Sequence, residues 1–446
     1  MNDRLGAMLI WKPRCATRAA GEEPERLDRN MHEPYRIKVV ESLPRVSPSA
    51  RKTAMTTAGF NTFHLQAGEV EIDLISDSGT GAMSSRQWSE VIAAREDFSG
   101  QESFRDFVKI GREIFGFEHV QPVHQGRAAE NLLFRLLLKS GEVAVSNTFF
   151  ETTRANIEVL GCEARDLPDA TPPWCGNIDL ARLERTLKRN RRVRLILLTV
   201  TNNIQGGQPV SLENMVRARE LADAHGVLLA LDASRFAGNA CRVKELTRSR
   251  KSIKRICRES FNQSHLAFLS LKKDGLANVG GVIGFNDHRL LEPLAHEVIR
   301  QESYPSAGGL AARDLAAMTV GLEESVDERV VGSHIRNVRF LADELKKNGV
   351  EIFEPVGAHG VVIHPRDRAR DAAHALAAEI YLEGGVRAGV FDGTVRLAVP
   401  RRVYSRDHLE HVADVVGRAY GRETMKLKCV HRPEEFSNFF ARFVAK

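Results

Sequence analysis

Short, wholly apolar runs that alternate with segments of helical spacing constrain the fold of this chain more than any other feature. Leu195–Val200, Val227–Leu231 and Leu266–Ser270 have the length of strands, and Ser211–His225 has the spacing of a helix with a serine cap. A strand with one face in water alternates apolar and polar residues, whereas a strand covered on both faces is apolar throughout. The pattern therefore predicts an α/β fold with a mostly parallel sheet and helices on both of its faces.

Further elements of the same kind lie on both sides of these runs. We predict strands at 71–75, 143–146 and 281–284, and helices at 84–94, 104–115, 128–138 and 183–189. After about residue 310 the pattern changes to a long helix at 309–324, short strands at 361–363 and 395–399, and a helix at 406–420. The domains we predict are a disordered extension (1–33), an arm that is part of a small domain (34–60), a large domain (61–310) and a small α+β domain (311–446).

Composition excludes several classes of protein. The chain has 446 residues and a net charge of +6, and its arginine-rich runs lack the interleaved aromatic residues of a nucleic-acid site. Its six cysteines show no CxxC or CxxH spacing, which argues against a structural zinc or a disulfide framework. No apolar run approaches the length of a membrane span, and no secretory signal is apparent. We expect a cytoplasmic protein without nucleic-acid or membrane partners, and Met31 is as good a start as Met1.

Polar residues follow the predicted strands at the points where ligands bind in such sheets, beyond the carboxyl ends. Asn203, Asp232, Arg235 and the run Ser270–Lys273 occupy these points. Taken singly, Asp232 could be a helix N-cap and Arg235 a surface charge. Together they are the expected layout of a cofactor site.

Two adjacent lysines, Lys272 and Lys273, stand directly after a buried strand. A lysine amine in an apolar pocket beside a second cation can form a Schiff base with an aldehyde cofactor. An ordinary exposed turn is the alternative explanation. Gln125-Gly126-Arg127 opens an apolar helix, and the backbone N–H groups of a helix start bind anions.

Eight motifs, in one order and spacing, resemble the tryptophanase and tyrosine phenol-lyase family of β-eliminating lyases. They are Pro34-Tyr-Arg-Ile-Lys-Val-Val-Glu, Ser76-Asp-Ser-Gly-Thr, His124-Gln-Gly-Arg-Ala-Ala-Glu, Gly206-Gly-Gln-Pro-Val-Ser, Asp232-Ala-Ser-Arg-Phe-Ala, Ser270-Leu-Lys-Lys-Asp, Arg396-Leu-Ala-Val-Pro-Arg-Arg and Ala441-Arg-Phe. The resemblance covers residues 34–443. It implies a fold-type-I large domain, a pyridoxal 5′-phosphate (PLP) cofactor, an L-amino acid substrate, and assembly as a homodimer or homotetramer.

The resemblance also assigns cofactor roles residue by residue. It implies that Lys273 binds the cofactor and moves the Cα proton, that Lys272 tunes this site, and that Asp232 keeps the pyridine nitrogen protonated. The remaining implied cofactor contacts are the phosphate cradle of Gln125, Gly126, Arg127 and Ser270, the partners Asn203 and Arg235 of the phenolic oxygen, and the stacking ring of Phe150.

Substrate and cation contacts are implied in the same way. Arg396 matches the arginine that pairs with the substrate carboxylate, where bidentate geometry matters. Ser76, Ser78, Glu151 and Asn438 match substrate-binding positions. Glu96, the carbonyl of Gly79 and Asn278 resemble the oxygen ligands of a monovalent cation, usually potassium.

The departures from the family concern the leaving group. Phe98 stands where the family has a tyrosine that reaches across from a neighbouring subunit and helps to protonate the leaving carbon, and phenylalanine has no proton to give. Ala307 replaces an expected aromatic residue, Asn438 replaces a Phe or His of the aromatic pocket, and the stretch between Arg387 and Val395 is shorter, with no counterpart of the phenol-contacting arginine.

We therefore expect a PLP-dependent β-lyase that releases ammonia, pyruvate and the β-substituent of an L-amino acid, with Phe98 as a catalytic position that alters the substrate. A better leaving group than a carbon atom, such as a thiolate, fits this change. The alternative is a PLP enzyme that performs β-replacement, retro-aldol cleavage or transamination. A non-catalytic cofactor-binding protein is a third hypothesis.

Overall fold

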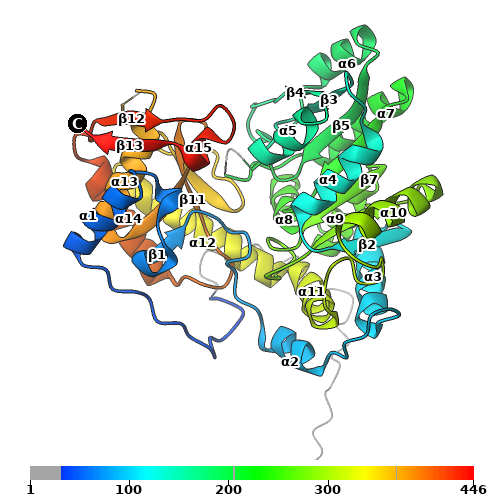
Figure 1. The fold of residues 1–446 in the computed structure, drawn as a ribbon, viewed down its shortest axis with the longest axis horizontal. Helices are drawn as coiled ribbons and strands as arrows, with labels where there is room; N and C mark the ends of the chain where they lie inside the picture. The colour runs from blue at the N-terminus through cyan, green and yellow to red at the C-terminus, as the bar shows by residue number, and fades with distance from the viewer. Residues whose placement is uncertain (1–31, 204–205, 368) are drawn as a thin grey trace, which may run out of the picture. The chain divides into compact units, whose positions relative to one another are not determined.

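The computed structural model describes residues 32–203, 206–367 and 369–446; the predicted extension up to Met31, including Cys15, lies outside these ranges. Its largest sheet has seven strands in the order β2-β8-β7-β6-β5-β3-β4 (Figure 1). In that order, the strands are His119–Val123, Gly281–Phe285, Leu266–Ser270, Leu228–Asp232, Val193–Thr199, Val143–Ser146 and Glu163–Asp166. The strands from β4 to β7 pair in parallel, and β8 is antiparallel to both β7 and β2. The predicted mostly parallel sheet is confirmed.

The apolar strands are buried on both faces, as their composition requires. Every residue of β7 and β8 is buried. On one face, β5 to β8 pack against α4 (Gly126–Leu137) and α10 (Leu291–Gln301) through one apolar core. A second group of helices packs together and onto β2 and β6: α3 (Glu102–Phe115), α7 (Leu212–His225), α8 (Phe236–Thr247) and α9 (Ile253–Phe261).

A second, four-stranded sheet has the order β1-β10-β11-β9, with strands Ile72–Leu74, Val386–Phe391, Thr394–Ala398 and Gly360–Ile363. β1 pairs in parallel with β10, although more than 300 residues separate them in the chain. Three helices share the core of this sheet: α12 (Glu328–Lys347), α13 (Ala372–Gly384) and α14 (Arg406–Tyr420). The predicted domain boundaries stay predictions, and β1 lies within the range 61–310.

The turn between β10 and β11 contains only Asp392 and Gly393, with φ of 48° and 72°. Both values lie in the left-handed region that a two-residue hairpin turn of this kind requires, which Asp-Gly adopts readily. The shortened stretch noted in the sequence is therefore a minimal hairpin.

The remaining helices and strands complete the chain. They are α1 (Pro48–Thr57, capped by Ser47), η1 (Thr62–His64), η2 (Ala67–Glu69), α2 (Ser85–Ala93), α5 (Glu151–Glu158), α6 (Leu180–Arg189), η3 (His288–Leu290, directly before α10), α11 (Ala312–Ser325), β12 (Leu427–His431), α15 (Ser437–Phe440) and β13 (Arg442–Ala445). Residues 37–46 of the predicted arm form neither helix nor strand. Cysteines in the described ranges are free, and no described helix is long and apolar enough to cross a membrane.

Candidate cofactor and substrate site

The start of α4, where the sequence predicts a phosphate cradle, lies against the ends of β7 and β8. A Cβ atom on Gly126 would lie 2.6 Å from Cβ of Ser270, and one on Gly281 would lie 2.5 Å from the carbonyl carbon of Gln125. Glycine at both positions is what lets the helix start approach the sheet this closely. The N–H groups in the first turn of a helix have no carbonyl partner inside that helix, and such a helix start suits an anion.

Lys272 and Lys273 lie in the turn after β7, and both are half-buried. Burial and the nearby Arg235 lower the pKa of Lys273 to about 8, although Asp77, Asp232 and Glu130 oppose this shift. An amine with such a pKa is available in its neutral, nucleophilic form near neutral pH. The N–H of Gly79 donates to the carbonyl of Lys272 at 2.7 Å, so the 76–80 turn lies against the lysines. The simple exposed turn considered as an alternative is not what the chain forms.

Asp232 is the last residue of β6, and only 9% of its surface is exposed. Its Oδ1 accepts hydrogen bonds from Ser234, from the hydroxyl at 2.9 Å and from the backbone N–H at 3.3 Å. A carboxylate buried at the carboxyl end of a central strand is well placed to pair with a protonated ring nitrogen.

Arg235, whose contact with the phenolic oxygen of the cofactor stays a prediction, binds Asp77 through two of its guanidinium nitrogens. Its Nε and Nη2 donate to the two carboxylate oxygens of Asp77 at 3.0 and 2.6 Å. Arg401, which follows β11, donates to the same carboxylate at 2.8 Å and to Asp274 in the lysine turn. Asp274 also accepts from the N–H of Gly238 at 2.8 Å. These side chains form a buried network that links the loop after β1 to the ends of β6, β7 and β11.

Burial by itself raises the pKa of Asp77, but Arg235 and Arg401 overcome this and hold it well below its usual range. The carboxylate is therefore charged at every physiological pH. Sequence reasoning quoted Asp77 and Arg401 inside motifs without giving either a role. The sequence did contain one indication of their importance, because each of these charged residues closely follows an apolar strand.

Arg396 and Asn203 contact each other. Nη1 of Arg396 donates to Oδ1 of Asn203 at 3.0 Å, and its guanidinium lies over the ring of Phe391 at 4.0 Å from the centroid. Burial and Arg235 lower the pKa of Arg396 to about 10, so it stays charged at neutral pH. Its Nε has no partner among the described residues, and a buried donor of this kind suits a carboxylate ligand.

Aromatic residues and one acid lie near Arg396. Phe391 lies 6.0 Å from both Phe150 and Phe63, and Phe63 lies 4.8 Å from Phe439. Glu151 accepts a hydrogen bond from Asn438 at 2.5 Å, whereas its Oε2 is buried without a partner among the described residues. Burial and then Asp392 raise the pKa of Glu151. The sequence pointed to Phe150, Glu151 and Asn438 but not to the rings of Phe63, Phe391 and Phe439.

Glu130 on α4 is a second buried carboxyl group that the sequence did not single out. It accepts hydrogen bonds from Thr153 at 2.9 Å and Asn156 at 3.0 Å. Burial, with Asp232 adding to it, raises its pKa to about 7. The raised pKa favours the protonated, neutral form of this buried carboxyl group.

Other predicted residues have partners away from this cradle. Phe98 is 77% exposed and lies 5.8 Å from the ring of Tyr304. Glu96 accepts from the N–H of Ala312 at 2.7 Å at the start of α11 and pairs with Arg313. Gly79 does lie near Asn278, since a Cβ on Gly79 would be 3.5 Å from the Asn278 carbonyl oxygen.

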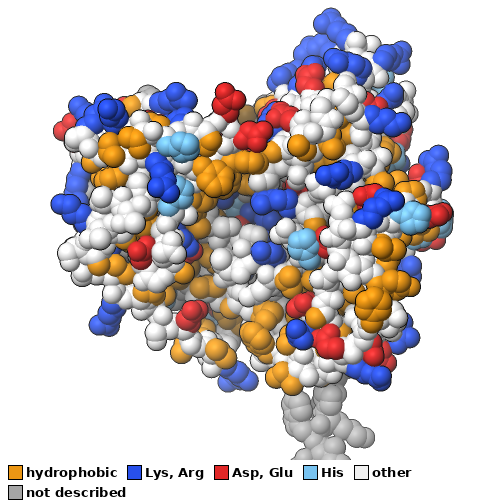
Figure 2. All heavy atoms as spheres, in the orientation of Figure 1, with side chains coloured by type: hydrophobic (Ala, Val, Ile, Leu, Met, Phe, Trp, Pro, Cys, Tyr) orange, Lys and Arg blue, Asp and Glu red, His pale blue; other side chains and the backbone are white. Residues whose placement is uncertain are grey.

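Ser76 and Ser78 lie in the turn after β1, where the hydroxyl of Ser76 accepts a hydrogen bond from the N–H of Ser78 at 3.1 Å. In Figure 2 the visible face is hollowed near its centre, and lysine and arginine side chains gather there. A positively charged hollow suits an anionic cofactor and a carboxylate substrate.

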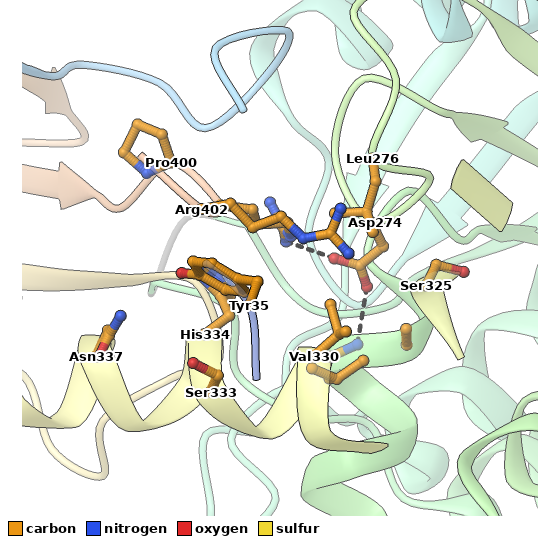
Figure 3. A pocket seen from close by; sticks show the side chains of 14 residues that line it. Tyr35, Asp274, Leu276, Ser325, Val330, Ser333, His334, Asn337, Pro400 and Arg402 are labelled. Atoms are coloured by element: carbon orange, nitrogen blue, oxygen red, sulfur yellow. Dashed lines mark hydrogen bonds and ion pairs between the residues drawn. The ribbon is translucent and has the colours of Figure 1, made fainter. Parts of the chain in front are cut away.

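A small cavity of about 30 Å³ lies on the far side of Asp274, lined by Tyr35, His334 and Arg402 among others. Figure 3 shows Asp274 at its edge, hydrogen-bonded to Arg401 and to the backbone of Gly238. Burial holds the pKa of His334 well below its usual value, and its Nε2 has no partner among the described residues. The space suits a water molecule or two and is too small for the cofactor.

Comparison with known proteins decides the family. The family model described as "Beta-eliminating lyase" matches residues 73–415. The chain belongs to this family. This β-eliminating lyase is 40% identical to a tryptophanase from Hyphomonas neptunium, over 92% of this chain and 98% of the other. It is 37% identical to a tyrosine phenol-lyase from Clostridium tetani, over 92% and 97% of the two chains.

Solved structures share the fold of this lyase at low identity. Serine palmitoyltransferase from Sphingomonas wittichii has a TM-score of 0.61 at 14% identity and covers 83% of this chain and 95% of its own. A Thermus thermophilus aspartate aminotransferase variant has a TM-score of 0.60 at 16% identity and covers 83% and 95%. The predicted family and fold-type-I class are confirmed, and the protein is a PLP-dependent β-eliminating lyase.

The residues present fit PLP. The cradle combines a helix start with two close-packed glycines, Gly126 and Gly281, and Ser270 lies beside the helix. Lys273 supplies an amine of lowered pKa, and Asp232 a buried carboxylate. These are the groups that the phosphate, aldehyde and protonated ring nitrogen of PLP require: N–H donors, a nucleophilic amine and a carboxylate acceptor.

Proposed function

We propose that this lyase removes the β-substituent of an L-amino acid and releases it with ammonia and pyruvate. The observation that carries the proposal is the placement of Lys273, with its lowered pKa, near Asp232 and Arg235 at the edge of the seven-stranded sheet. Gln125, Gly126, Arg127 and Ser270 would hold the phosphate of PLP, Asp232 its ring nitrogen, and Phe150 one face of its ring. When bound, PLP withdraws electrons from the substrate Cα and makes its proton removable.

Lys273 is the group that moves this proton. A neutral Nζ accepts a proton from Cα, and the ammonium that results is the donor for a later step. The half-buried Lys272 adjoins it and adds positive charge on the side of the 76–80 turn.

Arg396 would bind the substrate carboxylate, because its Nε is buried without a partner among the described residues. The substrate side chain would then lie among Phe63, Phe391 and Phe439, with the free Oε2 of Glu151 beside it. Rings and a single acid are suited to a flat apolar side chain that carries an N–H donor, and to an uncharged thioether.

Phe98 sets the limit on the leaving group. Its ring has no acidic proton, so a carbon leaving group that must be protonated is expelled slowly. A thiolate leaves without such help, which supports an S-substituted cysteine as substrate. The exposed positions of Phe98 and Glu96 support the proposal that each contributes to the site of a second copy of the chain, so that the active form is at least a homodimer. Glu96 would join Gly79 and Asn278 there at a potassium ion.

The test is an assay of pyruvate and ammonia with tryptophan, tyrosine and S-substituted cysteines. We expect S-substituted cysteines to be cleaved faster than tryptophan or tyrosine by at least about tenfold. Consumption of amino acid without pyruvate would instead favour β-replacement, retro-aldol cleavage or transamination.

Phe98→Tyr should restore a proton donor and raise kcat for tryptophan or tyrosine by about 10²-fold or more, which is the usual contribution of general acid catalysis. The rate with an S-substituted cysteine should change little, which makes that substrate the internal control. An unchanged rate with both aromatic substrates would contradict the role given to Phe98.

A further inference from the structure

Two histidines and a glutamate meet at an edge of the seven-stranded sheet, apart from the cradle. His119 is the first residue of the edge strand β2, Glu118 precedes it, and His288 begins η3 just after β8. Antiparallel pairing sets His119 opposite Phe285, the last residue of β8. The N–H of Glu118 also donates to the side chain of Asn286 at 2.8 Å. These backbone contacts therefore fix the Cα positions from which the three side chains extend.

The side-chain atoms have the spacing of a metal chelate. Nε2 of His119 lies 3.2 Å from Nδ1 of His288, and Nε2 of His288 lies 3.4 Å from Oε2 of Glu118. One ligand atom from each residue can be chosen so that all three lie within 4.8 Å of one another. Zinc–nitrogen bonds of 2.0–2.1 Å in a tetrahedral site place neighbouring ligand atoms about 3.3 Å apart. The imidazole pair is at this spacing, and the carboxylate needs to move by only about 1–2 Å.

His119 is held in place before any metal arrives. Its ring packs on Phe285 with centroids 5.1 Å apart and meets the His288 ring edge-on at 4.7 Å and 74°. The packing against Phe285 therefore sets the position of the His119 ring.

We propose that Glu118, His119 and His288 bind one divalent transition-metal ion of the zinc class. Two imidazole nitrogens beside one carboxylate oxygen suit Zn²⁺, Ni²⁺ or Cu²⁺ better than Mg²⁺ or Ca²⁺, which prefer ligand sets made of oxygen atoms alone. His288 and Glu118 are exposed, so water completes the coordination. The site joins β2 to η3 at the end of the β2–β8 pair that is opposite to Val123 and Gly281 beside the cradle. The ion is therefore structural, about 13 Å along β2 from the cradle.

The test is a calorimetric titration of Zn²⁺ into metal-free holoenzyme, with wild type, His288→Ala, His119→Gln and His411→Ala compared. His411 is an exposed histidine on α14 and serves as the matched control. We expect one saturable site per chain in wild type and His411→Ala, and at least about tenfold weaker binding in the other two variants. Zn²⁺ should raise the melting temperature of wild type and His411→Ala but not of His288→Ala.

Equal affinity in wild type and His288→Ala would overturn the proposal, as would the absence of a saturable site in wild type. Melting temperatures measured without metal show whether each variant is folded. Mg²⁺ at the same concentrations should give no heat of binding, and a response to Mg²⁺ equal to that of Zn²⁺ would also contradict the proposed ligand class.

Discussion

At the scale of single residues, the carboxyl groups near Lys273 have different pKa values because their environments differ. Asp77 is held in its charged form by two arginines, whereas burial raises the pKa of Glu130 to about 7. The lowered pKa of Lys273 is the balance between burial with Arg235 on one side and these carboxylates with Asp232 on the other. A substitution that removes one of these charges should therefore change a pKa value in the site by a measurable amount.

Glu130→Gln should change how stability depends on pH. The folded-state pKa of Glu130, about 7, is above the ordinary value of 4.5, so the unfolded state loses its proton first. Stability from this group is complete below pH 4.5 and is lost as the pH rises through 7. Between pH 5 and 7 the wild-type apoprotein should lose on the order of 2 kcal/mol that Glu130→Gln retains. Urea unfolding of both proteins at the two pH values measures the difference, and identical slopes would refute the raised pKa.

Glu151→Gln should change substrate preference more than overall activity. The unpartnered Oε2 of Glu151 is an acceptor for an N–H group on the substrate side chain. We expect kcat/KM for tryptophan to fall by about tenfold, the cost of one lost hydrogen bond, while an S-substituted cysteine is little affected. Asp392→Asn is the control, because Asp392 is exposed and near Glu151. A parallel loss with both substrates would indicate a structural role only.

At the scale of elements, the site depends on how closely α4 approaches β7 and β8. Its geometry is set by glycines, since Gly126 and Gly281 leave no room for a Cβ atom against the neighbouring backbone. A different local feature sets the hairpin that carries Phe391 and Arg396. The two-residue Asp392-Gly393 turn keeps this hairpin short. Two local features therefore determine the cofactor cradle and the substrate pocket.

Gly126→Ala should weaken PLP binding. The added Cβ would lie 2.6 Å from Ser270 and force the start of α4 away from the strand. We expect a loss of about 1–3 kcal/mol in stability from overpacking and at least about tenfold weaker PLP binding. Gly68→Ala is the matched control, because a Cβ there meets no atom within 4 Å. Equilibrium titration of the apoprotein with PLP distinguishes the two variants, and equal affinities would mean that the cradle tolerates a side chain.

At the scale of the whole described chain, one buried network joins the two sheets. Asp77 follows β1 and Arg401 follows β11 in the four-stranded sheet, whereas Arg235 and Asp274 follow β6 and β7 in the other. Removing one member of a buried ion pair costs about 3–5 kcal/mol because the other charge stays behind. Because Asp77 and Arg235 both join the sheets and act on the pKa of Lys273, the packing of the two sheets is coupled to the protonation of Lys273.

Asp77→Asn tests this coupling. The negative charge of Asp77 raises the pKa of Lys273, so its removal should move that pKa below 8. The rate of PLP association with the apoprotein depends on the neutral amine, and its midpoint pH should fall in the variant. Asp392→Asn, which is absent from the charges acting on Lys273, should keep the wild-type midpoint. A variant with reduced stability and an unchanged midpoint would limit Asp77 to a structural role.

The sequence by itself determined the elements and the family. Apolar strands, serine caps such as Ser211 and the stop at Gly116 are local or periodic properties, and the structure confirms β7 and α14 at the predicted residues. The placement of Asp232 and the lysine turn after neighbouring strands was also predictable from the sequence, because the ends of parallel strands meet at one edge of a sheet.

Only the tertiary structure decided which charged groups pair. Asp77 and Arg401 are 324 positions apart in the chain, and Glu118 and His288 are brought together by the pairing of β2 with β8. Long-range pairing depends on packing geometry that no local pattern encodes. The partner of Arg235, the free oxygen of Glu151 and the histidine pair could therefore be found only once the sheets were assembled.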